Sequence, residues 1–280
     1  MYNFSLFGIF KRFKSKIIFT WSLVLIEAIV FLLYPLFIGF AIDDLINKNT
    51  DGLIFFAGLA LFHLVFASAR RFYDTRIYSK IYLKIAPELT EKEFEKKSEA
   101  SKVSARTNML NELVEFLENQ FPEIVNTVIT LVGTLGILFL VNFNVFLGSM
   151  ITIIITLIVY GLSSDKIFRL NSGFNDELEK HFDVIKSRNK LSIFNHFDIL
   201  TKFNIKLSDL ETINFAAIWI SFIGLLVYSI YTIVYTQENS YGDTFSSIMY
   251  VFNFIETMIM LPYFYQQYVR LKEITDRISS

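Results

Sequence analysis

Two carboxylates lie inside long apolar stretches of this sequence, where a charge is costly. Glu27 lies in the stretch 17–42, and Glu256 lies in the stretch 245–265. A charge at the centre of a bilayer costs at least about 2.5–3.5 kcal/mol on insertion scales. Arg70 closes another apolar stretch, and no Lys or Arg inside a stretch is expected to neutralise either Glu. We therefore expect each Glu to be protonated, to face a hydrated cavity or to meet a ligand. The alternative is that both are neutral acids bonded to neighbouring helices.

Other polar residues accompany these two carboxylates. Tyr250, Asn253, Thr257 and Met260 recur at helical steps with Glu256 beside them, which predicts a polar and aromatic stripe on one helix. His63 lies in a separate apolar stretch, where it either is packed or hydrogen-bonded between helices, or lines a cavity. These residues are the candidates for a solute path.

Motifs for catalysis and for cofactor binding are missing from the sequence. It has no Cys, and its three His are isolated along the chain, so neither a disulfide scaffold nor a metal centre is predicted. No G-x-x-x-x-G-K-[S/T] motif occurs, and no G-x-S-x-G or H-E-x-x-H motif occurs. We expect a chain that is not an enzyme, holds no cofactor and meets ATP only through a partner domain.

The amino-acid composition indicates that the segments carrying these residues lie in a membrane. The 280 residues are 53% hydrophobic and 17% aromatic but only 19% charged, and the mean hydropathy is +0.46. Soluble chains carry about 25% charged residues. Intrinsic disorder is excluded by the high hydrophobicity. The net charge of −1 is uninformative as a sum, and no nucleic-acid partner is expected.

Six stretches are long enough to cross a hydrocarbon core about 30 Å thick. The predicted fold is all-α and polytopic, a single transmembrane domain over 1–280. Its spans are 17–42, 53–72, 123–141, 143–162, 213–235 and 245–265.

The basic residues predict the orientation. Of the 26 Lys and Arg, only Lys48 falls in a loop on the side opposite the long loops. Under the positive-inside rule, both termini and both long loops are therefore cytoplasmic. A plasma-membrane location is expected, with a bacterial inner membrane favoured.

The two inner loops, 73–122 and 163–212, are each 50 residues long and carry helical periodicity. In the first loop, Ile77, Ile81, Ile85 and Leu89 recur every four residues. Each loop is predicted to form two helices that run out and back and project about 33 Å. Such hairpins are either devices for touching a partner or solvated extensions without one.

These features together resemble the transmembrane domain of ABC exporters along the whole chain. The segment 34–45 is similar to the family's first-helix ending, in which a Pro is followed by a Gly and then an Ile-Asp pair. Phe94 and Arg106 have the spacing of the family's first coupling loop, and Asp183 and Phe194 have that of the second. The tail 271–278 is similar to the linker that leads to an ATPase domain.

The resemblance implies short coupling helices near 94–101 and 187–194 that dock on ATPase domains. It assigns Phe94, Ser98, Ser101, Arg106, Asp183, Ser187 and Phe194 to the coupling loops, and Glu27, His63, Tyr250, Asn253, Glu256 and Thr257 to the translocation path. This chain departs from the family pattern at four positions. Ser101 and Ser187 replace Gly, Leu110 replaces an acidic residue, and Ser192 replaces Lys.

The expected function is the membrane-spanning subunit of an ABC-type exporter. Such a subunit forms a homo- or heterodimer and moves a hydrophobic or cationic solute outward with an ATPase supplied in trans. The alternative is an exporter-like accessory or scaffold protein that has lost ATPase coupling. A proton-coupled carrier that uses Glu27 or Glu256 is a third possibility, but no pair of Gly- or Pro-broken helices supports it.

Overall fold

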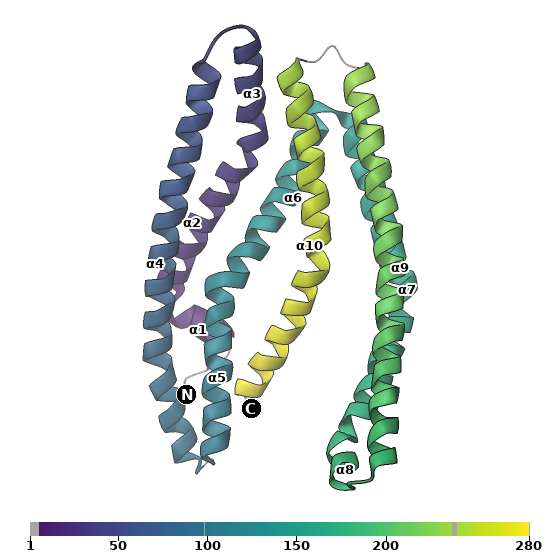
Figure 1. The fold of residues 1–280 in the computed structure, drawn as a ribbon. Helices are drawn as coiled ribbons and strands as arrows, with labels where there is room; N and C mark the ends of the chain where they lie inside the picture. Colours follow the sequence, from purple (N-terminus) through teal and green to yellow (C-terminus); the bar gives the residue numbers. More distant parts are fainter. Residues whose placement is uncertain (1–5, 98, 237–239, 280) are drawn as a thin grey trace. The chain divides into compact units, whose positions relative to one another are not determined.

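The computed structural model describes residues 6–97, 99–236 and 240–279, and every element assigned in them is helical. Figure 1 shows the elements in chain order. They are α1 (Leu6–Arg12), α2 (Lys14–Leu32), α3 (Tyr34–Ile46), α4 (Asp51–Glu95), α5 (Ala100–Glu115), the π-helical segment η1 (Phe116–Gln120), α6 (Phe121–Val141), α7 (Phe143–Glu179), α8 (His181–Lys186), α9 (Lys190–Thr236) and α10 (Tyr241–Ser279).

The described helices include six segments that are long and apolar enough to cross a membrane. The all-α fold with six spans is thereby confirmed. Two long helical hairpins are also confirmed, because α4 continues from a span to Glu95 and α7 continues to Glu179. The 45 residues of α4 extend about 68 Å, which is more than twice the thickness of a hydrocarbon core.

Packing divides the chain into two compact units. Unit 1 comprises 1–142 and 236–280, and unit 2 comprises 143–235. Unit 1 therefore contains α1 to α6 and α10, and unit 2 contains α7, α8 and nearly all of α9. The expectation of one transmembrane domain over 1–280 stays a prediction.

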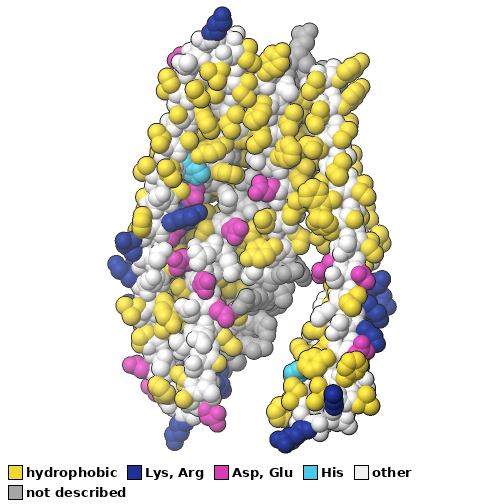
Figure 2. Space-filling model, in the orientation of Figure 1, with side chains coloured by type: hydrophobic (Ala, Val, Ile, Leu, Met, Phe, Trp, Pro, Cys, Tyr) yellow, Lys and Arg dark blue, Asp and Glu magenta, His cyan; other side chains and the backbone are white. Residues whose placement is uncertain are grey.

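The core of unit 1 lies along its hairpin. Ile81, Ile85 and Leu89 of α4 are each about 1% exposed and pack in one cluster with Leu110 and Leu113 of α5. The four-residue periodicity of the sequence is therefore the buried seam between the two arms. In Figure 2, hydrophobic side chains cover the half of unit 1 that carries the α3–α4 loop, and Lys and Arg gather toward the other half.

The first span is broken at Leu33 into α2 and α3, because Pro35 lacks the N–H that would continue the ladder. Side chains of α10 satisfy carbonyls at this break. The Tyr250 hydroxyl donates to the Leu32 carbonyl at 3.1 Å, and the Ser246 hydroxyl donates to the Pro35 carbonyl at 2.7 Å. The break is thus a fixed bend.

Two carboxylates at the end of α3 connect this helix to the starts of α10 and α4. Asp43 accepts the Gly242 N–H at the start of α10 at 2.8 Å. Asp44 accepts the Gly52 N–H at the start of α4 at 2.7 Å. A carboxylate stabilises a helix N-terminus by hydrogen bonding and by charge. α3 and α10 also approach closely, since a Cβ at Gly39 would lie 2.6 Å from the Gly242 carbonyl oxygen.

Unit 2 pairs α7 and α9 along their lengths, with α8 at one end (Figure 1). Small residues permit the contact. A Cβ added at Gly148 would lie 3.0 Å from Leu225. The Ser163 hydroxyl donates to the Asn214 side-chain oxygen at 2.6 Å, and both residues are buried. Small residues and hydroxyls at helix interfaces are typical of membrane helices.

The hairpin ends differ from the coupling helices that the resemblance implies. In the first, α4 ends at Glu95 and α5 begins at Ala100, so the described residues of 94–101 hold no separate short helix. In the second, the short helix is α8 at 181–186, before the expected 187–194, which instead holds a turn and the start of α9. Lys97 and Arg188 adopt positive φ at these turns, a conformation that ends a helix.

Candidate functional site

Glu27 is paired with a cation, which corrects the expectation that no basic residue would neutralise it. The Nε of Arg70 on α4 donates to the carboxylate of Glu27 on α2. The Nη1 of the same Arg70 donates to Asp74 Oδ2 at 2.5 Å. The Arg70 side chain is 10% exposed. The expectation failed because it treated Arg70 as the end of a span, whereas α4 continues unbroken and packs its guanidinium on α2.

This Glu27–Arg70–Asp74 cluster sets two carboxylates against one guanidinium. The Oδ1 atom of Asp74 is buried and has no hydrogen-bond partner among the described residues. Glu118, on η1, adds a further negative charge to the electrostatic surroundings of Asp74. The cluster ties α2 to α4 and leaves Glu27 with 18% of its side chain exposed.

The stripe predicted on α10 is divided between two faces. Tyr250, Asn253 and Thr257 are buried, at 2%, 9% and 6% exposure. Glu256 is exposed, and so is Met260. Tyr250 serves the bend at Leu32, and the Thr257 hydroxyl donates to its own helix at Phe254. The stripe is therefore not one continuous polar face, because burial separates its members by their angle around the helix.

His63 is hydrogen-bonded between helices. Its Nδ1 lies 2.7 Å from the Tyr34 hydroxyl on α3, and the two rings meet edge to face. The side chain is half-buried. Its role as a lining residue of a solute path stays a prediction.

The end of the first hairpin combines an exposed aromatic ring with a buried ion pair. Phe94 is 60% exposed and Ser101 is exposed, while Ser98 lies outside the described residues. Arg106 points inward, where its Nη1 donates to a Glu93 carboxylate that is only 1% exposed. Arg106 therefore joins the two arms of the hairpin instead of presenting its charge to a partner.

A second ion pair fastens α1 to the same hairpin. The Arg12 guanidinium donates to both oxygens of Glu88, at 2.5 and 2.7 Å. This hydrogen bonding holds the pKa of the Glu88 carboxyl below its usual range. Both side chains are about a quarter exposed, so the pair is solvent-screened.

The end of the second hairpin presents apolar side chains. Asp183, Ser187 and Phe194 are all exposed, and their assignment to a coupling loop stays a prediction. The neighbouring apolar residues are exposed as well. Phe182 is 73%, Ile185 48%, Leu191 69% and Phe194 67% exposed.

His181 and His196, isolated in sequence, meet in the structure. His181 Nδ1 lies 3.0 Å from His196 Nε2, and His196 Nδ1 lies 2.8 Å from Glu177 Oε1. Fifteen residues and a helix-to-helix turn separate the two His, so spacing alone gave no signal. Among the described residues, no three His, Asp or Glu side chains are placed to hold a metal ion.

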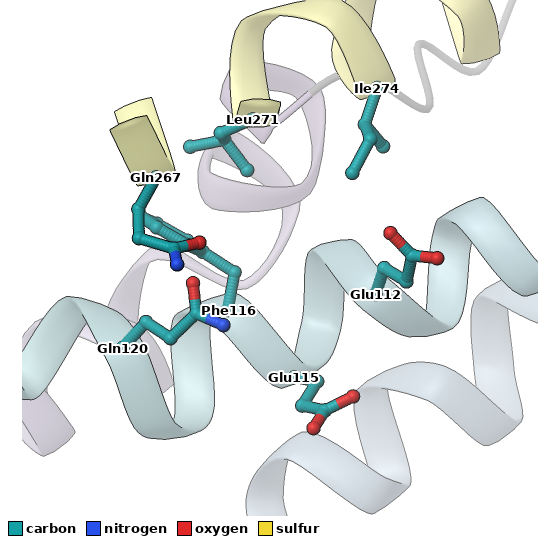
Figure 3. Close-up of a pocket in the computed structure, with 7 residues that line it drawn as sticks. All are labelled: Glu112, Glu115, Phe116, Gln120, Gln267, Leu271 and Ile274. Carbon is teal, nitrogen blue, oxygen red and sulfur yellow. The ribbon is translucent and has the colours of Figure 1, made fainter. Parts of the chain in front are cut away.

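Sequence reasoning also missed a cavity in unit 1 of about 140 Å³, open to solvent (Figure 3). It lies where the helix becomes π-helical at η1, and π-bulges are frequent at functional sites. Its lining mixes carboxylates, amides and apolar groups. They are Glu112, Glu115, Phe116, Gln120, Gln267, Leu271 and Ile274.

The sequence also matches a known protein family. A family model described as ABC transporter transmembrane region matches residues 6–242. The chain belongs to this family of ABC transporter membrane domains. No curated protein sequence matches the chain.

As a membrane subunit of an ABC-type transporter, the chain has lipid around its six spans. The exposed Ile, Leu and Phe within the spans of α4 and α7 are then lipid- or protein-facing. The family also associates such a domain with an ATPase. The match covers both hairpin ends and stops just after the start of α10.

Proposed function

We propose that this chain forms the solute path of an ABC-type exporter as one half of a homo- or heterodimer. The ATP-hydrolysing domains that drive it are encoded outside these 280 residues and dock on the two hairpin ends. Both termini and both hairpins are cytoplasmic, in a bacterial inner membrane.

The observation that carries this proposal is the apolar surface at the end of the second hairpin. Phe182, Ile185, Leu191 and Phe194 are exposed together, more than 15 residues from either span of unit 2. An exposed apolar patch away from lipid is typical of a protein-binding site. Phe94 adds an exposed ring at the first hairpin end.

Charge supports the orientation. The end of the second hairpin carries Lys186, Arg188 and Lys190, while the loop between α3 and α4 carries Lys48 alone. This bias favours hairpins on the cytoplasmic side, where ATP is hydrolysed.

The small number of spans in unit 2 and their exposed apolar surface support the dimer. Two paired helices cannot surround a solute path by themselves, and hydrophobic side chains such as Leu157 and Val227 remain more than 60% exposed on them. A second subunit would cover part of this surface and close the path.

Glu256 supports a hydrated path. It is exposed within the apolar part of α10, and a carboxylate in contact with lipid has a large energetic cost. A water-filled path would remove this cost and attract cationic or hydrogen-bond-donating solutes.

Docking is tested by copurification of this chain with a candidate ATPase from the same cell. Phe194→Glu should abolish copurification, because it places a charge in the apolar patch. Ile205→Glu is the matched control, since Ile205 is 53% exposed on the same helix but about 16 Å farther from the end. Equal copurification of both variants would contradict docking at the hairpin end. Failure of every ATPase to copurify with the unaltered chain would favour the scaffold alternative.

The path is tested with Glu256→Gln, which keeps the shape of the side chain and removes its charge. Solute-stimulated transport into inverted vesicles should fall, while the melting temperature in detergent should not change. Asp243→Asn is the control, because Asp243 is exposed at the start of the same helix. Unchanged transport in Glu256→Gln would remove Glu256 from the path. The purified chain alone should neither bind nor hydrolyse ATP.

A further inference from the structure

A hydrogen-bonded chain of ionisable groups closes the end of the second hairpin. Glu177 belongs to the last turn of α7, His181 opens α8, and His196 lies near the start of α9. The three side chains therefore link the three helices of unit 2. His196 is the centre of the chain and its side chain is 1% exposed. The Phe197 ring lies edge-on to both imidazoles, with centroids 5.7 and 5.5 Å away.

The ionised state of Glu177 determines which nitrogens of His196 and His181 carry hydrogens. Lys180 Nζ donates to Glu177 Oε2 at 2.8 Å. The hydrogen bonds from Lys180 and then from His196 hold the pKa of Glu177 below its usual range, so Glu177 is an ionised acceptor. His196 Nδ1 must then carry a hydrogen, and in a neutral ring its Nε2 accepts one from His181 Nδ1.

Only one hydrogen can lie between His181 Nδ1 and His196 Nε2. A first added proton can be carried on the outer nitrogen of His181, and both hydrogen bonds survive. A second added proton would charge His196 as well and point two N–H groups at each other across 3.0 Å. Both bonds cannot then persist, and two like charges face each other.

We propose that His181 and His196 form a pH-sensitive latch that fastens α8 to α9 when the pair carries at most one added proton and releases α8 when both rings are protonated. Histidine is the side chain whose charge ordinarily changes between about pH 5 and 8. In acid the released pair holds two added protons and the latched pair at most one, so falling pH favours release by linkage. The ratio of released to latched hairpin can change by up to about tenfold per pH unit.

Other charged groups near the two His side chains make their protonation easier or harder. On α7, Asp176 acts on Lys180, and on α9 Asp198 pairs with Lys202 at 2.6 Å. Asp183 on α8 is exposed. Glu177 favours the added protons and Lys180 opposes them.

Release would move the exposed apolar surface of α8, which includes Phe182 and Ile185. The latch itself rests on unit 2 alone. Its effect on ATPase docking rests on the proposed function, and the two are tested separately.

The latch is tested by distance measurement between two spin labels on the full chain in detergent. The chain has no native Cys, so the pair Ile185→Cys and Asn195→Cys reports on α8 against α9. We expect a narrow distance distribution at pH 8 that broadens and lengthens reversibly toward pH 5. The control pair Asn195→Cys and Ile205→Cys lies within α9 and should not change.

Variants separate the latch from a general acid effect. His196→Gln and, independently, His181→Gln should abolish the pH response, because an amide does not titrate. His63→Gln should retain it, which controls for the third His of the chain. Glu177→Gln should shift the response to lower pH, since the added protons lose a neighbouring negative charge.

An unchanged distribution from pH 8 to pH 5 would overturn the latch, as would a full response in both His181→Gln and His196→Gln. A titrating latch with pH-independent ATPase copurification would leave the latch standing and remove its role in coupling. A titrating latch without any copurifying ATPase would instead contradict the proposed function.

Discussion

The two units hold their helices together with different chemistry. Unit 1 also has hydroxyl and imidazole contacts between helices, but it adds buried ion pairs, in which Arg70 joins α2 to α4 and Arg106 joins α4 to α5. Unit 2 uses hydroxyls, amides and imidazoles, as in the Ser163–Asn214 and His181–His196 contacts. An arginine stays charged at every physiological pH, whereas histidine does not. Unit 1 should therefore be the rigid part and sensitive to loss of a charge, and unit 2 should be the adjustable part.

The largest effect should come from Arg70→Gln. This change leaves Glu27 and Asp74 close together without a counter-charge, and breaking a buried pair costs about 3–5 kcal/mol. A fall on the order of 10 °C in the melting temperature in detergent is expected. Arg71→Gln, at the exposed neighbouring position, is the control. Equal melting temperatures of the two variants would show that the cluster does not stabilise unit 1.

A smaller effect, about 2–3 kcal/mol, is expected from Arg106→Gln. Glu93 is buried and loses its main partner, but Lys96 lies 3.4 Å from the same carboxylate and compensates in part. Protease cleavage within the first hairpin should accelerate. Lys102→Gln, on the exposed face of α5, should leave the cleavage rate unchanged. If both rates stay at the unaltered value, Arg106 does not hold the hairpin arms together.

Ser163→Ala should cost only about 0.6 kcal/mol, the average for hydrogen bonds between membrane helices, and at most about 1.7 kcal/mol. Asn214 loses its donor, but the α7–α9 contact remains otherwise intact. The melting temperature should fall less than in either arginine variant. Ser164→Ala is the control, because its hydroxyl bonds its own helix at Gly161. A loss as large as that of Arg70→Gln would erase the contrast between the units.

The smallest effect concerns the exposed pair of Arg12 and Glu88. Because the folded-state pKa of Glu88 is lowered, its stabilisation is present above the ordinary range of glutamate, near pH 4.3, and is lost as the pH falls through the folded value. Glu88→Gln should therefore reduce stability by at most about 1 kcal/mol at pH 7, and by progressively less as the pH falls through the folded-state pKa of Glu88. Stability measured against pH would contradict this if the difference grew in acid.

Much of the architecture was predictable because it depends on local periodicity. The six spans, the two hairpins and the buried seam of Ile81, Ile85 and Leu89 follow from apolar spacing, which the bilayer and the hairpin core both require. The candidate site was less predictable. Which of the polar residues on α10 are buried depends on the neighbours of that helix, so Tyr250 and Glu256 were wrongly joined in one stripe.

The sequence by itself determined that this is a six-span all-α membrane domain of the ABC transporter type, because length, hydropathy and motif spacing are properties of the chain alone. Only the tertiary structure decided which charges meet. Arg70 reaches Glu27 across 43 residues, and His181 reaches His196 across a turn. It also gave the Gly39 and Asp43 of the first-helix motif their physical roles, as a close approach to α10 and a cap on it. Such pairings depend on how helices cross, and no spacing within one helix specifies that.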